Sequence, residues 1–121
     1  MLVSWLARGE ILHFVLEGEY DFSEVHLLEG AFETAFKNPH SVLLIHTEPV
    51  EFKDGNFQIC SSGCAFVDGA TLKVLASNFA KAKQEGREVW VILTPRLKRL
   101  FDIVNLTRWC DKVEVVEVNE N

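Results

Sequence analysis

No segment of this sequence stays apolar for long, and basic residues are in the minority. The longest apolar runs, 42–45 and 89–93, fall far short of the roughly 18 residues that a membrane-spanning helix needs. The 121 residues include 18 acidic and 12 basic side chains, for a net charge of −6. Binding to nucleic acid or to an anionic membrane needs a basic patch. The cluster Arg96–Arg99 is explained as the solvated face of a short helix, so we expect neither nucleic-acid binding nor membrane insertion.

A signal peptide and an even set of cysteines are also missing. Residues 1–10 have no basic start and no small-residue cleavage site. The three cysteines are an odd number. We therefore expect a cytoplasmic protein with free thiols.

Cys60 and Cys64 are the one pair of thiols that lie close in sequence, with three residues between them. Zinc ribbons and thioredoxin-like sites use a shorter spacing. Further metal ligands, His40, His46 or Cys110, would have to come from separate elements. The sequence therefore predicts no metal and no cofactor. It favours Cys64 as a small core residue and Cys60 as a loop thiol, with a redox-sensing disulfide as the open alternative.

Groups for hydrolytic or phosphate chemistry are not assembled either. His13 alternates with apolar strand residues and His26 lies on the first predicted helix, so neither adjoins a nucleophile turn. A lone histidine is more often structural than catalytic. The glycines at 55, 63 and 69 lack the spacing of a phosphate-binding loop. We expect no enzymatic activity, and a small enzyme or ligand carrier ranks third among the function classes.

The apolar periodicity predicts one α/β domain over residues 1–121, in the order β-β-α-β-α-β-α-β. A strand, a helix and a strand in succession favour a parallel right-handed crossover, so we expect a mixed sheet covered by helices. Trp90 is expected to pack in the core. The expected strands are Leu2–Ala7, Ile11–Glu17, Ser41–His46, Glu88–Leu93 and Val113–Val118, and the expected helices run from about Asp21 to Phe36, from Asp68 to Glu85 and from Pro95 to about Asn105.

The central helix carries the clearest local signals. Asp68 suits the N-cap position, because its carboxylate can accept hydrogen bonds from the first free N–H groups of a helix. Gly86 stands where helices commonly end in a left-handed residue. The face between them is apolar at Leu72, Leu75, Ala76, Phe79 and Ala82. Such a start points N–H groups and a positive helix dipole outward. The simplest interpretation is a capped core helix, and a binding role needs support from the rest of the chain.

Residues 47–65 connect the third strand to the central helix by an irregular path. Val50–Lys53 and Asn56–Ile59 each alternate apolar and polar residues. The dipeptide Asp54-Gly55 between them favours a type I′ turn. We therefore predict a hairpin-like insertion before the central helix.

The apolar side chains of this insertion, Phe52, Phe57 and Ile59, are expected to lie beside the start of the central helix. Two roles are open for them. They either cover an edge of the core, or they form a contact with a partner or with a second copy of the chain.

Four motifs share their order and spacing with one family. They are Gly18-Glu19-Tyr20-Asp21 after the second strand, Phe66-Val67-Asp68 before the central helix, Gly86 at 18 residues beyond Asp68, and Leu97–Asp102 followed by Leu106. The first is similar to the Gly-Glu-hydrophobic-Asp, and the second to the Phe-hydrophobic-Asp switch loop, of STAS domains. The chain thus resembles, over nearly its whole length, the STAS fold of bacterial anti-sigma factor antagonists.

The resemblance implies a non-enzymatic regulator of transcription that acts by partner switching. Such domains bind a kinase-type anti-sigma factor and displace its sigma factor, and the kinase phosphorylates a serine directly after the switch-loop Asp. The alternative in the same fold is an accessory subunit of a lipid-transport complex or of a stress-signalling assembly. A homodimer also stays open. By this resemblance the partner-binding residues are Asp21, Asp68, Gly69, Ala70, Thr71 and Lys73.

The sequence departs from the family at the phosphorylation site. Gly69 stands where STAS domains of this kind have the serine, so the position has no hydroxyl. Thr71 is the nearest hydroxyl, and we expect it to bond locally or to face the groove. Assigning the switch to Ser61 and Ser62 would misplace the central helix. We therefore predict a STAS protein without the usual serine switch.

Overall fold

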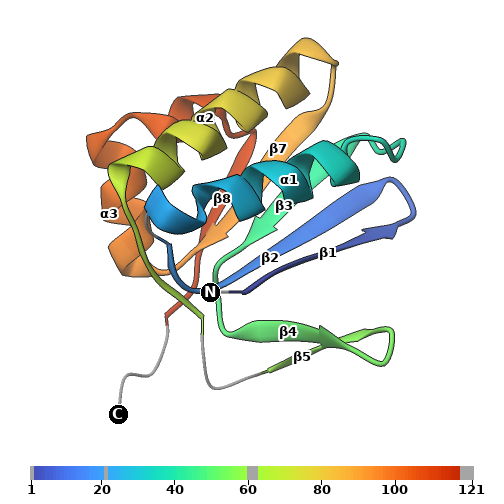
Figure 1. The fold of residues 1–121 in the computed structure, drawn as a ribbon, viewed down its shortest axis with the longest axis horizontal. Coiled ribbons are helices and arrows are strands. Elements are labelled where there is room, and N and C mark those ends of the chain that lie inside the picture. The colour runs from blue at the N-terminus through green and yellow to red at the C-terminus, as the bar shows by residue number, and fades with distance from the viewer. Residues whose placement is uncertain (1, 21, 60–62, 118–121) are drawn as a thin grey trace.

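A six-stranded sheet lies at the centre of the computed structural model, which describes residues 2–20, 22–59 and 63–117 (Figure 1). Five strands follow one another across the sheet in the order β1-β2-β3-β7-β8, and β6 pairs with the end of β2. Their bounds are β1 Leu2–Arg8, β2 Ile11–Tyr20, β3 Val42–His46, β6 Cys64–Val67, β7 Glu88–Leu93 and β8 Lys112–Val115.

The sheet is mixed, as the element order predicts. β1 and β2 form an antiparallel hairpin, whereas the pairs β2–β3, β3–β7 and β7–β8 are all parallel. The expected crossover between the third strand and the strand after the central helix is confirmed, since β3 and β7 are neighbours. The last strand is shorter than predicted, and all four of its residues are exposed.

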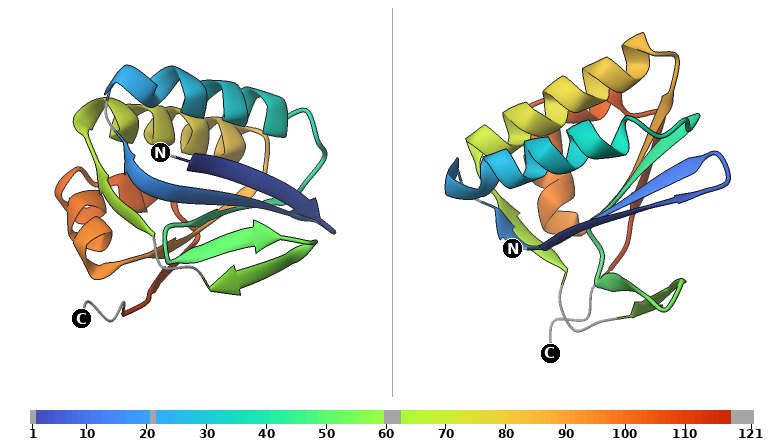
Figure 2. Two further views of the ribbon diagram at one scale, coloured as in Figure 1. Left: turned by 60° about the horizontal axis from the view of Figure 1, so that its bottom comes forward. Right: turned by 45° about the vertical axis from the view of Figure 1, so that its right-hand side comes forward.

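Helices cover one face of this sheet. α1 (Val25–Ala35) follows the 3-10 turn η1 (Phe22–Glu24), and α2 (Gly69–Gln84) follows β6. Figures 1 and 2 show α1 and α2 side by side and running in the same direction. Both helices therefore begin at the same end of the molecule. α3 (Pro95–Ile103) and the 3-10 turn η2 (Leu106–Trp109) complete the layer.

The core lies between the sheet and these helices. Alternate residues of each strand point to the helices, so a row of side chains crosses the sheet at Phe14, Ile45 and Val91, each at most 1% exposed. Phe14 stacks on Phe32 of α1, with ring centroids 4.2 Å apart. Phe79 and Phe101 are also at most 1% exposed. Burial of this apolar surface is the main stabilising term of the fold.

The placement of Trp90 differs from the prediction. Its neighbours Val89 and Val91 face the core, so Trp90 points to the opposite side of β7 and keeps part of its surface exposed. The ammonium of Lys112 lies 4.1 Å from the centroid of the indole ring. A strand with one core-facing set of residues must turn the alternate set away, and Trp90 belongs to that second set.

The predicted hairpin is present, as β4 (Val50–Lys53) paired with β5 (Asn56–Ile59). Its turn residues Asp54 and Gly55 have φ values of 53° and 80°, the positive values that a type I′ turn requires. Figures 1 and 2 show the hairpin on the side of the sheet away from α1 and α2. It covers part of the second sheet face rather than extending the sheet.

The two ends of the insertion meet at Gly63. A Cβ at this position would come within 2.9 Å of the Thr47 carbonyl oxygen and 3.1 Å of the Pro49 nitrogen. The Gly63 carbonyl accepts a hydrogen bond from the N–H of Gly18, and the N–H of Cys64 donates to Thr47. A residue without a side chain is therefore needed where the insertion returns to the sheet.

Candidate partner-binding site

The start of α2 is fixed by two hydrogen bonds that Thr71 donates to Asp68. One carboxylate oxygen of Asp68, Oδ1, accepts hydrogen bonds from the Thr71 N–H and from the Thr71 hydroxyl, each at 2.9 Å. Asp68 itself has extended backbone geometry, and its carbonyl accepts from the N–H of Leu72. The predicted N-cap is thus confirmed. It satisfies one of the free N–H groups at the helix start and sets the direction in which α2 leaves β6.

Gly69 and Ala70 leave this helix end open. Gly69 is exposed, and a Cβ added to it would meet no atom within 4 Å. Ala70 is partly exposed and adds only a methyl group. Another protein can therefore approach the backbone of the first helical turn closely. Thr71 differs, since it is 0% exposed. It positions Asp68 and cannot touch a partner in this conformation.

The neighbouring elements extend this end of the molecule. The segment η1 contacts α2, and α3 contacts β6. Figure 1 shows the first turn of α2 beside the first turn of α1. Because both helix starts face the same way, the positive ends of two helix dipoles lie together. Leu27, in the first turn of α1, is 51% exposed.

Sequence reasoning did not single out Leu27. The apolar spacing of the first helix places Val25, Leu28, Phe32 and Ala35 or Phe36 on its inner face, and all five are buried or partly buried. Leu27 falls outside that spacing. The sequence feature that could have identified Leu27 as a contact residue is a leucine on the outward face of an amphipathic helix.

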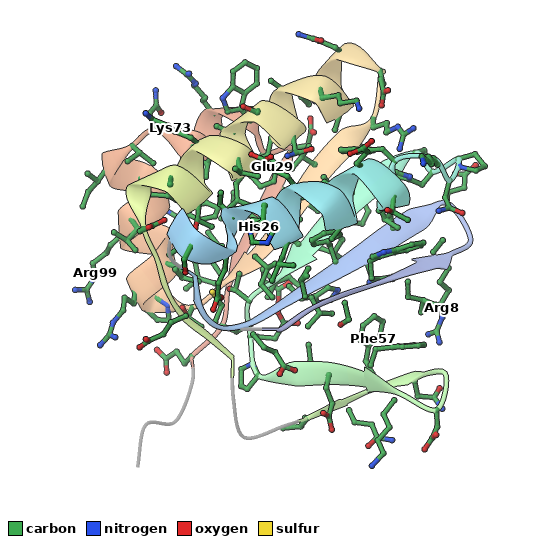
Figure 3. The ribbon with its side chains drawn as sticks, viewed as in Figure 1. Arg8, His26, Glu29, Phe57, Lys73 and Arg99 are labelled. Carbon is green, nitrogen blue, oxygen red and sulfur yellow. The ribbon has the colours of Figure 1, made fainter. Side chains whose placement is uncertain are left out.

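A groove of about 520 Å³ runs between α1 and α2 from this end. Carboxylates of Glu29 and Glu33 line its α1 side, and the ammonium groups of Lys73 and Lys81 line its α2 side; Figure 3 labels Glu29 and Lys73. Within the described ranges no ion pair joins the two walls. Lys73, predicted as a contact residue, is exposed and belongs to this groove. The groove therefore offers unpaired charges of both signs to a partner.

Other predicted site residues lie elsewhere. Asp21 falls outside the described residues, as do Cys60, Ser61 and Ser62. The expectation that Phe52, Phe57 and Ile59 lie beside the start of the central helix is wrong, because the hairpin lies across the sheet from α2 (Figure 2). Phe52 and Phe57 cover the second sheet face, whereas Ile59 is 89% exposed.

The described thiols are not in reactive environments. Cys64 is 2% exposed and packs in the core, as predicted. Burial, together with the negative charge of Asp111, raises the pKa of the Cys110 thiol to about 12. In the described part of the chain, no three histidine, cysteine or acidic side chains are grouped as metal ligands. No helix in the same part is long and apolar enough to cross a membrane.

No protein-family model matches this sequence, and no curated protein does so either. Solved structures do match the fold. An anti-sigma factor antagonist from Mycobacterium paratuberculosis superposes with a TM-score of 0.72 at 17% identity, over 93% of this chain and 84% of that chain. The unphosphorylated anti-sigma factor antagonist SpoIIAA gives 0.65 at 15% identity, over 98% and 90% of the two chains.

A third similar structure is that of the protein TM1081, with a TM-score of 0.67 at 12% identity, over 95% of this chain and 82% of that chain. The chain therefore has the fold of the anti-sigma factor antagonists, the STAS fold that the sequence motifs predict.

Proposed function

We propose that this chain is a non-enzymatic, cytoplasmic regulatory protein that binds a protein partner through the exposed start of α2. The partner that best fits the fold is a kinase-type anti-sigma factor. The observation that carries the proposal is the open first turn of α2, where Gly69 has free space around it on a helix start fixed by Asp68.

The contact face is built from three parts. The first turn of α2 offers backbone at Gly69 and Ala70, the first turn of α1 offers the exposed side chain of Leu27, and the groove adds charges. A helix start attracts negative charge, and an exposed leucine gains free energy when a partner covers it. The carboxylates and ammonium groups around these parts orient the partner and contribute less to the affinity.

In this proposal the protein has no phosphorylatable serine at the start of α2. Residue 69 has no hydroxyl, and the Thr71 hydroxyl is buried and donates to Asp68. A kinase would have to open the first helical turn to reach Thr71. Binding is therefore proposed to be constitutive at the start of α2, since Thr71 carries the one hydroxyl of residues 68–71 and cannot take a phosphate without disrupting the cap.

The test is affinity purification of the tagged protein from lysate of its own cells, with partners identified by mass spectrometry. Gly69→Asp places a carboxylate on the contact face. The matched control is Gln84→Asp, which adds the same charge at the exposed far end of the same helix. Circular dichroism establishes that both variants are folded.

Recovery of an anti-sigma kinase with the wild type and with Gln84→Asp, but not with Gly69→Asp, supports the proposal. Recovery of transporter subunits instead favours the accessory-subunit function. Equal recovery of the kinase by both variants rules out the start of α2 as its binding site. Intact mass spectrometry adds a separate check, because stoichiometric phosphate on Thr71 would overturn the absence of a switch.

A further inference from the structure

A chain of three ionisable side chains lies between the second sheet face and the hairpin. His46 is 7% exposed. Its Nδ1 lies 2.6 Å from Oε1 of Glu48, and its Nε2 lies 2.9 Å from Nδ1 of His13. His13 comes from β2 and His46 from β3, so the sheet pairing brings them together over 33 positions of sequence. Nothing in the proposed partner-binding face uses these residues.

Only one proton fits between the two imidazoles. A carboxylate can only accept, so Nδ1 of His46 donates to Glu48. The contact between His46 Nε2 and His13 Nδ1 then needs one nitrogen to donate and the other to accept. When both rings are protonated, N–H groups stand on both of these nitrogens, and the hydrogen bond cannot exist. The arrangement therefore requires that at least one of the two rings is neutral.

The hairpin is held against the sheet through this pair. The Phe57 ring of β5 lies 4.7 Å from the His13 ring and 5.1 Å from the His46 ring, measured between centroids. Phe52 of β4 meets the edge of Phe57. Arg8 of β1 donates a hydrogen bond to the Gly55 carbonyl in the hairpin turn, and its guanidinium lies 5.9 Å from the Phe57 ring centroid. Figure 3 shows Phe57 pointing from the hairpin toward the sheet.

We propose that the β4–β5 hairpin is a proton-sensitive clasp, closed over the second sheet face while at least one of the His13 and His46 rings is neutral and opened when both rings are protonated. Opening separates Phe57 from both rings and lets water reach them. The proposal concerns a different surface from the partner-binding face and stands without it.

The charges around His13 favour its neutral state, and therefore the closed position of the hairpin. The pKa of His13 is lowered from 6.5 to about 4, first by burial and then by the positive charges of His46 and Arg8, while Glu48 acts in the opposite direction. Glu51 and Lys53 alternate with Phe52 along β4 and so lie on its other face. β5 presents only the Phe57 ring to His13.

The direction in which pH shifts the hairpin between its closed and open forms follows from proton binding. Well above pH 6.5, His13 is neutral in both the closed and the open form, and pH has no effect on the clasp. Below that value the open form binds a proton that the closed form does not, so acid favours opening. Between about pH 7 and about pH 5 the open-to-closed ratio is expected to rise about tenfold, less than the full shift implies, because His13 keeps part of its surface in water.

Hydrogen exchange of the hairpin amides measures the opening. A hairpin released from the sheet is marginally stable by itself, so residues 50–59 should lose protection when the clasp opens. Protection factors, corrected for the intrinsic effect of pH on exchange, are compared at about pH 7 and about pH 5. Amides of β2 and β3 in the same sample report global stability. We expect the hairpin to lose about tenfold in protection while the central strands lose less.

His13→Gln is the informative variant, since its amide can still donate to His46 but does not titrate in this range. Its hairpin protection should not change with pH. His26→Gln, at an exposed histidine of α1 (Figure 3), is the matched control and should keep the wild-type response. A pH response that persists in His13→Gln, or protection in the wild type that is equal at both pH values, overturns the proposal.

A titration of the wild type gives a result even where His13→Gln does not fold. The ring protons of His13 followed by NMR should titrate well below pH 6.5, and hairpin protection should fall as the pH is lowered from 6.5 toward that midpoint. A hairpin that stays protected after His13 has taken up its proton contradicts the clasp.

Discussion

The two faces of the sheet are made by the same strands one residue apart, yet they are stabilised differently. On the helix face, Phe14 and Ile45 are fully buried under α1 and α2. On the hairpin face, their neighbours His13 and Leu44 keep part of their surface exposed. The first face depends on apolar burial alone. The second depends on a small number of directed contacts among aromatic, histidine and acidic side chains.

The difference shows which parts of the fold are robust. Apolar packing is insensitive to pH and tolerates local change as long as volume is kept. The hairpin face uses hydrogen bonds whose existence depends on protonation, such as the one between His13 and His46. Regions with few apolar contacts open first. The hairpin is therefore expected to open without loss of the core, and four substitutions test this contrast.

The largest effect is expected for Phe32→Ala on the helix face. Phe32 is 0% exposed and stacks on Phe14. Removing it leaves a cavity, and the free energy of unfolding should fall by about 3–5 kcal/mol. Urea denaturation followed by circular dichroism measures the change. Phe32→Leu, which fills most of the space, should cost less than half as much. A small loss in Phe32→Ala would mean that the two faces contribute alike.

Gly63→Ala is expected to have the next largest effect. The added Cβ would collide with backbone atoms of Thr47 and Pro49, which cannot move as a flexible side chain could. The free energy of unfolding should fall by about 1–3 kcal/mol, with early loss of hairpin protection in hydrogen exchange. Gly30→Ala is the control, because a Cβ there meets nothing within 4 Å and a helix favours alanine. Equal stability of the two variants would contradict the close approach.

Phe57→Ala removes the aromatic contact of the hairpin face. Because the ring is only partly buried, the loss in unfolding free energy should be about 1–2 kcal/mol, below that of Phe32→Ala. Residues 50–59 should lose protection from hydrogen exchange, while β2 and β3 keep theirs. Matched losses in the hairpin and in the central strands would show that the hairpin and the core unfold together.

The smallest effect is expected for Asp68→Ala. Asp68 lies on neither face of the sheet, so this loss in unfolding free energy serves as a reference for the other three. It removes the acceptor for the Thr71 N–H and hydroxyl. The free energy of unfolding should fall by about 1 kcal/mol, the usual value of an N-cap. Asp68→Asn keeps an acceptor oxygen and should recover most of the loss. If Asn is no better than Ala, the carboxylate acts by its charge on the helix dipole rather than as a cap.

Short-range signals in the sequence predicted most elements and the ends that carry a cap or a turn. Asp68 caps α2 because a carboxylate at the helix start reaches the next N–H groups, and this geometry needs only four consecutive residues. Gly86 has a positive φ of 77° just beyond α2, and Asp54-Gly55 makes the hairpin turn. Motif order then indicated the STAS fold, although neither a family model nor a curated relative matches the sequence.

Sequence reasoning was less successful wherever two distant segments had to be placed together. It put the hairpin beside α2, and it put Trp90 in the core. Neither could be derived locally, because an alternating strand has two equivalent faces until its partners are known. The meeting of His13, His46 and Phe57 had no signal in the sequence at all.

The sequence by itself determined the order of the helices and of the strands other than β6, the cap of α2, the hairpin turn and the glycine in place of a switch serine. These features rest on local hydrogen bonds, allowed backbone angles and apolar periodicity. Only the tertiary structure decided that Thr71 is buried, that Leu27 is exposed beside the start of α2, and that Phe57 rests on two histidines. Those outcomes depend on which faces of separate elements meet, and that is set by packing of the whole chain.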